Sequence, residues 1–319
     1  MILRLLSLVL FLAALALPAR AQDFPLTIAH KFGETVIDAP PERVATLDFA
    51  GADDLLALGI EPVALRYWYG DFDGPLWPWA APRLTSDPVV LSGEIDYERV
   101  AAADPDVILA LWSGITEADY AQLSRIAPVV AVPEGVGDYE LPWDERARIA
   151  GRATGRAGAA EAQVRAIEAR LAAIAAAHPD WDGRTASVAY AMAGTPGAYT
   201  SADLRAQLLA QLGFETPAAI DAAAGGGNPF AVTLSEEALS VLDADLILWL
   251  STDGDHAAVE ALVTRGFLGA TRAGQEVLAG RLLSGALSHA SLLSLPYALD
   301  LLVPALETAL AGEGPVVTE

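Results

Sequence analysis

The chain has 319 residues and no cysteine, its hydrophobic content is 53%, and 42 acidic residues outnumber 19 basic ones to give a net charge of −23. These figures exclude a disulfide scaffold, a cysteine-ligated metal protein and an intrinsically disordered chain. Because Lys31 is the only lysine and the arginines form no cluster, nucleic acid is not expected as a partner, and the length predicts about two domains.

The first 21 residues are typical of a secretory signal. Arg4 gives the positive start, residues 5–17 form a mostly apolar run, and Ala19-Arg20-Ala21 is a small-x-small cleavage motif. The run is shorter than the roughly 20 residues that span a bilayer, and the chain has no cysteine that could carry a lipid. We therefore expect cleavage after Ala21 and a soluble exported protein that begins at Gln22.

Residues 22–142 alternate short apolar runs with helical patterns, which is typical of α/β layers with parallel strands. A hairpin is expected over Leu26–Ile37. Strands are expected at Arg43–Asp48, Pro62–Arg66, Val89–Leu91, Asp106–Leu111 and Pro128–Val132. Helices are expected at Asp53–Leu58, Tyr97–Ala103 and Thr116–Ser124. This segment is predicted to form an N-terminal lobe.

Residues 180–319 repeat this plan and are predicted to form a C-terminal lobe. Strands are expected at Thr185–Met192 and Asp245–Leu250, and helices at Arg205–Leu212 and Glu236–Leu242. The segment 98–111 can be laid over 237–250 at a fixed offset of 139 residues. The likeness favours two lobes of one architecture, although shared helix–strand patterns alone would also produce it.

An alanine-rich tract, residues 143–179, separates the halves and is predicted to be a helical linker. Helices are expected at Trp143–Thr154 and Ala157–Ala177, and the second ends before His178-Pro179. The predicted fold class is α/β, with two Rossmann-like lobes of mainly parallel sheets joined by a single long interlobe helix. Such lobes enclose a cleft, and we expect only modest closure because one helix bends less readily than a two-stranded hinge.

The sequence lacks a nucleophile elbow, a phosphate-binding loop and a dinucleotide fingerprint. Its four histidines are not spaced as paired metal ligands, so neither a catalytic residue nor a protein-bound metal is expected. The adjacent acids Asp53-Asp54 and Glu236-Glu237 are interpreted as solvated helix starts rather than catalytic pairs.

Ligands of open parallel sheets bind beyond the carboxyl ends of the strands, and this rule selects candidate site residues. They are Arg66, Trp68, Tyr69, Trp112, Ser113, Tyr190, Tyr199, Arg205 and Trp249. Residues 67–79 are rich in aromatic side chains, which either line the cleft or fill the base of the lobe. Ring stacking, with charge-assisted hydrogen bonds from Arg66 or Arg205, would suit a large, anionic, partly aromatic molecule.

Six segments, in their order and spacing, resemble the substrate-binding proteins of ABC importers for ferric siderophores. The segments are Ile28–Gly33, Arg43–Asp48, Gly93–Glu98, Ser124–Val130, Tyr199–Arg205 and Leu295–Asp300. The resemblance implies that an iron(III)–siderophore complex binds in the interlobe cleft of a monomeric periplasmic protein that is not an enzyme. It also implies delivery to the permease and ATPase of an inner-membrane ABC transporter, with iron held only by its chelator and no other cofactor.

By position in this family, Glu98 and Glu237 match the surface glutamates that dock each lobe on the permease, and they are equivalent in the internal repeat. Favourable interaction with the helix dipole is the alternative role for both. His289 stands where an aromatic or small residue is expected, and it is included among the ligand-binding candidates. Only Arg66, Arg205 and Arg281 are placed to serve the cleft, fewer than in some catecholate binders.

Three alternatives stay open on the sequence. A haem- or cobalamin-binding protein would have the same fold and a different ligand. An exported hydrolase would act in the cleft through a nucleophile such as Ser113, for which the sequence offers no evident histidine partner. A ligand sensor would contact a receptor in place of a permease.

Overall fold

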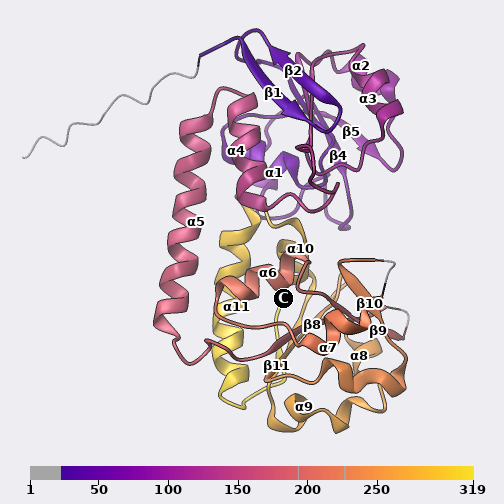
Figure 1. Cartoon of the computed structure of the whole chain (residues 1–319), viewed down its shortest axis with the longest axis vertical. Helices are drawn as coiled ribbons and strands as arrows, with labels where there is room; N and C mark the ends of the chain where they lie inside the picture. Colours follow the sequence, from indigo (N-terminus) through magenta and orange to yellow (C-terminus); the bar gives the residue numbers. More distant parts are fainter. Residues whose placement is uncertain (1–22, 193, 226–227) are drawn as a thin grey trace, which may run out of the picture.

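The computed structural model describes residues 23–192, 194–225 and 228–319, so the expected signal segment lies outside the described residues. The chain forms two α/β lobes stacked along the long axis of the molecule, and helix α5 (Ala157–Ala177) runs beside both (Figure 1). Within the described ranges, no helix is long and apolar enough to cross a membrane. The predicted fold class is confirmed.

The N-terminal lobe is built on a five-stranded parallel sheet with the strand order β5-β4-β3-β6-β7. Its strands are short, apolar and mostly buried, as expected for a sheet covered on both faces. They are β3 (Val44–Thr46), β4 (Ala64–Tyr67), β5 (Val89–Ser92), β6 (Val107–Ala110) and β7 (Val129–Ala131). The antiparallel hairpin of β1 (Leu26–His30) and β2 (Gly33–Ile37) precedes the sheet. The helices are α1 (Gly51–Ala57), η1 (Ala81–Arg83), α2 (Tyr97–Ala102), α3 (Glu117–Leu123) and α4 (Trp143–Ala153). Helix α4 falls in the predicted linker, but its buried residues pack in the core of this lobe.

The C-terminal lobe has a six-stranded mixed sheet with the order β10-β9-β8-β11-β12-β13. Its strands are β8 (Ala186–Met192), β9 (Thr195–Tyr199), β10 (Ala231–Thr233), β11 (Leu246–Leu250), β12 (Glu276–Ala279) and β13 (Val316–Val317). The helices are α6 (Leu204–Gln211), α7 (Ala218–Ala223), η2 (Glu236–Leu242), α8 (Ala257–Glu260), η3 (Arg265–Phe267), α9 (Gly269–Ala273), α10 (Arg281–His289) and α11 (Ser294–Leu310). Strand β9 pairs antiparallel with both neighbours, and the other pairs are parallel.

The C-terminal lobe also contains elements that the sequence did not reveal. Strand β9 has the sequence Thr-Pro-Gly-Ala-Tyr. The sequence does not predict a strand here, because proline and glycine are rare in strand interiors. Helix α11 was not predicted either, because it contains Pro304 and proline is unfavourable in a helix interior. The segment Glu236–Leu242, predicted as a helix, is a 3₁₀ helix.

An apolar core crosses the junction between the lobes. Ala57 and Leu58, at the end of α1, belong to the same buried cluster as Leu283 and Leu287 of α10. Gly285 lies on the same helix against the ring of Trp77, and a Cβ at this glycine would come within 2.3 Å of the ring. The close approach of helix and indole therefore requires glycine.

A buried ion pair stands beside this core and connects the lobes. The Nε atom of Arg146, on α4, donates to Asp54 Oδ2 at 2.8 Å, and both side chains are almost fully buried. The Nη2 atom of Arg146 donates to the carbonyl of Ala290 at 2.7 Å, in the turn between α10 and α11. Asp54 Oδ1 accepts from the backbone N–H of Leu292 in the same turn at 2.9 Å. The guanidinium and the carboxylate are thus both satisfied across the junction.

The neighbouring acid extends the network. Asp53 Oδ2 accepts from Ser291 Oγ and from Trp79 Nε1, each at 2.7 Å. The interpretation of Asp53 and Asp54 as a solvated helix start is therefore wrong, since the two residues are only 3% and 1% exposed. They are interlobe contacts because α1 points its first turn at the C-terminal lobe.

We expect Arg146→Met to lower the free energy of unfolding by about 3–5 kcal/mol, because the substitution leaves Asp54 buried without its counter-charge. Urea unfolding monitored by circular dichroism measures the loss. Arg148→Met is the matched control on the same helix, since Arg148 pairs with Glu161 and Glu168 in partly solvated positions. There we expect a loss of about 1 kcal/mol. Equal losses in the two variants would contradict the role given to Arg146.

Candidate functional site

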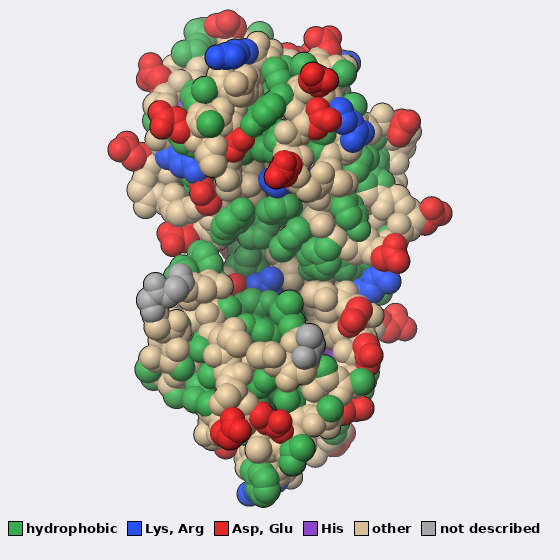
Figure 2. All heavy atoms as spheres, turned by 90° about the vertical axis from the view of Figure 1, so that its right-hand side faces the viewer, with side chains coloured by type: hydrophobic (Ala, Val, Ile, Leu, Met, Phe, Trp, Pro, Cys, Tyr) green, Lys and Arg blue, Asp and Glu red, His purple; other side chains and the backbone are tan. Residues whose placement is uncertain are grey.

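A groove separates the lobes on one face of the molecule. Figure 2 shows hydrophobic side chains bordering it and a basic side chain inside it. The groove contains a cavity of about 290 Å³. The lining residues from the N-terminal lobe are Phe49, Trp68, Trp112 and Tyr139, and those from the C-terminal lobe are Asp203, Leu204, Arg205 and Phe230. On the N-terminal side the cavity is bounded by an aromatic wall, Phe49, Trp68, Trp112 and Tyr139, and Arg205 lies on the opposite side.

The aromatic wall comes from the loops that follow three parallel strands. Phe49 lies beyond β3, Trp68 directly follows β4, and Trp112 lies beyond β6. The Trp68 ring centroid lies 5.2 Å from that of Phe49 and 5.5 Å from that of Trp112, and the second pair meets edge to face. The backbone N–H of Trp112 donates to Asp48 Oδ1 at 2.6 Å, so a buried carboxylate fixes this loop.

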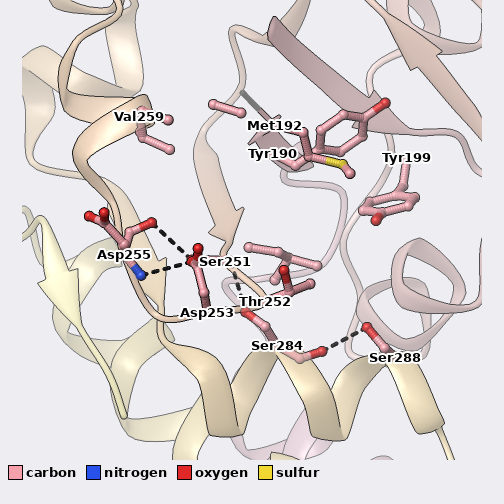
Figure 3. Close-up of a pocket in the computed structure, with 13 residues that line it drawn as sticks. Tyr190, Met192, Tyr199, Ser251, Thr252, Asp253, Asp255, Val259, Ser284 and Ser288 are labelled. Atoms are coloured by element: carbon pink, nitrogen blue, oxygen red, sulfur yellow. Dashed lines mark hydrogen bonds between the residues drawn. The ribbon is translucent and has the colours of Figure 1, made fainter. Parts of the chain in front are cut away.

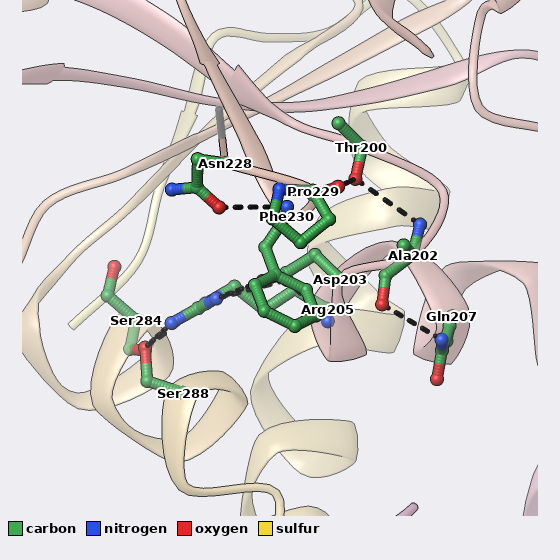
Figure 4. Close-up of polar contacts among 10 residues, drawn as sticks. All are labelled: Thr200, Ala202, Asp203, Arg205, Gln207, Asn228, Pro229, Phe230, Ser284 and Ser288. Atoms are coloured by element: carbon green, nitrogen blue, oxygen red, sulfur yellow. Dashed lines mark hydrogen bonds and ion pairs between the residues drawn. The ribbon is translucent and has the colours of Figure 1, made fainter. Parts of the chain in front are cut away.

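Arg205 forms the opposite wall, in the first turn of α6. Its Nη1 donates to both carboxylate oxygens of Asp203, at 3.0 and 2.9 Å, and its Nε and Nη2 lie 3.3 and 3.1 Å from Ser288 Oγ (Figure 4). The guanidinium also lies 4.1 Å from the ring centroid of Tyr199. Asp203 caps α6 by accepting from the backbone N–H of Arg205. One carboxylate therefore both starts the helix and orients the arginine.

A second cavity, also of about 290 Å³, lies within the C-terminal lobe at the carboxyl ends of β8 and β11. Tyr190 and Tyr199 stand on one side of it and Asp253 and Asp255 on the other (Figure 3). Ser288, on α10, also lines this cavity. Because Tyr199 and Ser288 both contact Arg205, this arginine lies between the two cavities.

Arg66 and Ser113 do not line the interlobe cavity. Arg66 donates to the backbone carbonyls of Ser113 and Gly93, at 2.9 and 3.0 Å, and its guanidinium lies 4.4 Å from the ring centroid of Phe49. The hydroxyl of Ser113 is buried and donates to the carbonyl of Ala110. Arg66 thus contacts the Phe49 ring of the aromatic wall, and Arg66 and Ser113 both line a separate depression of the N-terminal lobe.

The aromatic residues of segment 67–79 divide between the two expected roles. Trp68 lines the cavity, whereas Trp77 and Trp79 pack at the lobe junction with ring centroids 4.9 Å apart. The ring of Tyr69 lies between these groups, 4.7 Å from Trp68 and 5.3 Å from Trp77, and burial raises the pKa of its hydroxyl.

His289 was predicted as a ligand-binding residue, and the structure corrects this prediction. The side chain is 4% exposed, lies 5.3 and 5.4 Å from the rings of Trp68 and Trp77, and donates through Nδ1 to the carbonyl of Gly285. Burial lowers the pKa of the imidazole to about 4. His289 is therefore a neutral packing residue behind Trp68.

Trp249 was also predicted in the cleft and is instead a core residue. It is 0% exposed, and its Nε1 donates to Glu276 Oε1, which Arg265 also binds. Strand β11 continues to Leu250, so Trp249 lies inside the sheet and not beyond its carboxyl end. The predicted strand Asp245–Leu250 already contains Trp249, so the rule for residues beyond strand ends does not apply to it.

Several residues that line the cavity are not among those predicted from the sequence. Phe49 directly follows the predicted strand Arg43–Asp48, so the rule that selected Trp68 would also have selected Phe49. Asp203 precedes a predicted helix, where an acid signals an N-cap. Tyr139 and Phe230 lie in loops and carry no such signal. In the described part of the chain, no group of three or more acidic or histidine side chains is arranged to hold a metal ion.

Acid unfolding should reveal the burial of His289. Its pKa falls from an ordinary value of 6.5 to about 4, so the unfolded chain takes up this proton first and the free energy of unfolding decreases as the pH falls through that range. A shift of this size corresponds to roughly 3 kcal/mol. We expect the wild type to lose about that much more stability than His289→Asn between about pH 7 and pH 4, measured by urea unfolding.

Protonation of two buried acids changes the free energy of unfolding in the opposite direction over the same pH range. Burial raises the pKa of Asp48 and of Asp53 from 3.8 to about 6, so the folded chain holds their protons at a higher pH than the unfolded chain and is stabilised as the pH falls. Both proteins in the comparison retain these acids, so their effect cancels in the difference. Parallel pH dependence of the wild type and His289→Asn would contradict a buried neutral histidine.

The chain is similar to several known proteins. It is 28% identical over 240 residues to the probable siderophore-binding lipoprotein YfiY of Bacillus subtilis, and the alignment covers 72% of this chain and 70% of YfiY. It is also 28% identical over 262 residues to a cobalamin-binding protein of Halobacterium salinarum, covering 76% of this chain and 64% of that protein. The solved structure of PiaA from Streptococcus pneumoniae in complex with ferrichrome superposes with a TM-score of 0.74 at 28% identity, covering 90% of this chain and 99% of PiaA.

A family model described as periplasmic binding protein matches residues 44–277. This range includes the parallel sheet of the N-terminal lobe, the interlobe helix α5 and the C-terminal strands up to the start of β12. The match therefore covers both walls of the interlobe cavity. The chain belongs to the periplasmic binding protein family.

Proposed function

We propose that the protein binds an iron(III)–siderophore complex in the interlobe cavity and delivers it to the permease of an inner-membrane ABC importer. The observation that carries this proposal is the aromatic wall of Phe49, Trp68, Trp112 and Tyr139, which offers ring faces to a bulky chelate. The similarity to YfiY and to ferrichrome-bound PiaA supports the same class of ligand. Iron enters and leaves inside its chelator, with no ligand from the protein and no other cofactor.

The proposal assigns no enzymatic activity to the cavity. The competing hydrolase would use Ser113, but its hydroxyl is buried and donates to a backbone carbonyl. Nucleophilic catalysis requires a base within hydrogen-bonding distance. Among the described residues, the hydrogen bonds and ion pairs of His30, His178 and His289 go to other partners. His256 has no hydrogen-bond partner within the part of the chain that the structure describes and lies on the C-terminal lobe, whereas Ser113 follows β6 of the N-terminal lobe.

Delivery requires a docking surface on each lobe, and we assign it to Glu98 and Glu237. Glu98 is exposed in the first turn of α2, where the side chain of Asp96 already provides the N-cap. Glu237 is exposed at the equivalent place in η2, and hydrogen bonds from its own backbone N–H and from Ser235 lower its pKa. Two exposed carboxyl groups in equivalent positions fit a cationic permease surface. The working form would be a periplasmic monomer, with the ATPase acting through the permease.

Cobalamin is the second candidate ligand, because a relative of similar identity is a cobalamin-binding protein. A corrinoid is also a bulky preformed metal complex, so the aromatic wall suits it too. The chain covers 64% of that relative, compared with 70% of YfiY and 99% of PiaA. A side-by-side titration distinguishes the two ligands.

We expect ferrichrome or another ferric siderophore to quench tryptophan emission, because Trp68 and Trp112 line the cavity. Free ferric iron should leave the emission unchanged. Trp68→Ala should weaken binding at least about tenfold in calorimetric titrations, since a central aromatic contact is lost. Trp249→Phe is the matched control, and its affinity should equal that of the wild type because Trp249 is buried in the C-terminal core.

The outcome that contradicts this ligand assignment is an absence of binding across a panel of ferric siderophores. Binding of cobalamin alone would favour the second candidate. If Trp68→Ala and Trp249→Phe lowered the siderophore affinity equally, the interlobe cavity would not be the binding site.

We expect Glu98→Ala combined with Glu237→Ala to abolish siderophore-dependent uptake by cells while leaving the affinity of the purified protein unchanged. Both carboxylates are exposed and lie outside the cavity, so only the contact with the permease should suffer. Glu117→Ala, which removes an exposed first-turn glutamate from α3, should retain normal uptake. Normal uptake by the double variant would contradict the docking role.

A further inference from the structure

The charge of the cavity walls restricts which ligands can bind, in addition to the restriction set by the shape of the cavity. The residues lining the interlobe cavity and the adjoining cavity of the C-terminal lobe include one cation, Arg205, and three acids, Asp203, Asp253 and Asp255. Within the described ranges, the two cavities together therefore carry an excess of negative charge. An anionic ligand would enter against this field.

The single cation is already matched by the protein. Arg205 binds both oxygens of Asp203 and also contacts Ser288, so its donors are directed at protein acceptors. The guanidinium and the carboxylate are mostly buried and form a charge-assisted pair. Asp203 already balances the charge of this arginine, so an anionic ligand group at Arg205 would also lie close to the Asp203 carboxylate.

The other arginines expected near the cleft are engaged elsewhere. Arg66 donates to two backbone carbonyls. Arg281 donates to the carbonyl of Asp71 at 2.5 Å and lies 3.8 Å from the ring centroid of Phe72. Neither residue lines either cavity. Of the two arginines expected to hold an anionic ligand, only Arg205 lines the cavity, and its charge is balanced by Asp203.

The acidic edge of the C-terminal cavity is held in place by its own hydrogen bonds. Asp253 Oδ1 accepts from Ser251 Oγ at 2.7 Å and from the backbone N–H of Asp255 at 3.0 Å (Figure 3). These bonds lower the pKa of Asp253, so its carboxylate stays ionised at neutral pH. The opposite edge is aromatic, and ring faces attract neutral or cationic groups more than anions.

We infer that the cavity selects a ferric chelate that is uncharged or carries net positive charge, and discriminates against polyanionic chelates. The inference rests on the proposed function and adds the charge class of its ligand. A ferric trihydroxamate satisfies the requirement, because three singly charged hydroxamates neutralise iron(III). A ferric tris-catecholate, with a net charge of −3 from six phenolates, does not.

The experiment is a calorimetric titration of the wild-type protein with three ferric chelates. They are ferrichrome as the neutral trihydroxamate, a linear trihydroxamate with a free ammonium group as the cation, and a tris-catecholate as the trianion. We expect the first two to bind at least about tenfold tighter than the trianion at physiological ionic strength. Raising the salt concentration should strengthen any residual binding of the trianion, because salt screens repulsion.

Removing the acidic edge gives a second readout. Asp253→Asn with Asp255→Asn should narrow the ratio between neutral and trianionic affinity by about threefold or more, because two repelling charges are lost. Asp180→Asn with Asp182→Asn changes the net charge equally at exposed positions outside both cavities, and the ratio should stay as in the wild type.

Three results would overturn the inference. The first is a trianion that binds as tightly as ferrichrome, and the second is trianion binding that weakens as salt is added. The third is an equal change of the affinity ratio in the two double variants. Binding of none of the three chelates would instead remove the proposed function, and the inference with it.

Discussion

The interlobe cavity depends on the buried contact between Arg146 and Asp54. Arg146 belongs to the N-terminal lobe, yet its remaining hydrogen bonds end on the turn between α10 and α11. Because a charge that is buried without partners is strongly unfavourable, the lobes keep the relative position in which these donors and acceptors are matched. That position sets the spacing between Trp68 on one wall and Arg205 on the other, and hence the width available to a ligand.

Much of the fold could be predicted from local sequence patterns. Helix α5 has its predicted bounds because Val164, Ile167 and Leu171 repeat at helical spacing and His178-Pro179 ends the pattern. Strand β9 and helix α11 could not be predicted in this way, because prolines and a glycine stand inside them. Their conformation is imposed by pairing with β8 and by packing in the interlobe core, which are contacts that a local pattern does not contain.

Site residues could be predicted where their position follows from the sheet topology. They could not be predicted where their position depends on side chains that are distant in the sequence. Trp68 and Trp112 were found because they follow parallel strands, and Trp249 was wrong because it lies inside its strand and is fully buried in the core. The burial of Asp54 could not be predicted, since its partner Arg146 is 92 residues away in the chain. The contact of Arg205 with Ser288 likewise joins residues that are 83 positions apart, on two elements of which one was not predicted.

The composition and the electrostatics of the cavity have a common cause. With 42 acids and 19 basic residues, the chain has few cations available for its buried carboxylates. Arg146 matches Asp54 at the junction and Arg205 matches Asp203 at the cavity, so both arginines satisfy acids of the protein itself. What remains for a ligand is the aromatic wall, with ring stacking and shape as the main source of affinity. A binding site of this kind follows from the scarcity of basic residues in the chain.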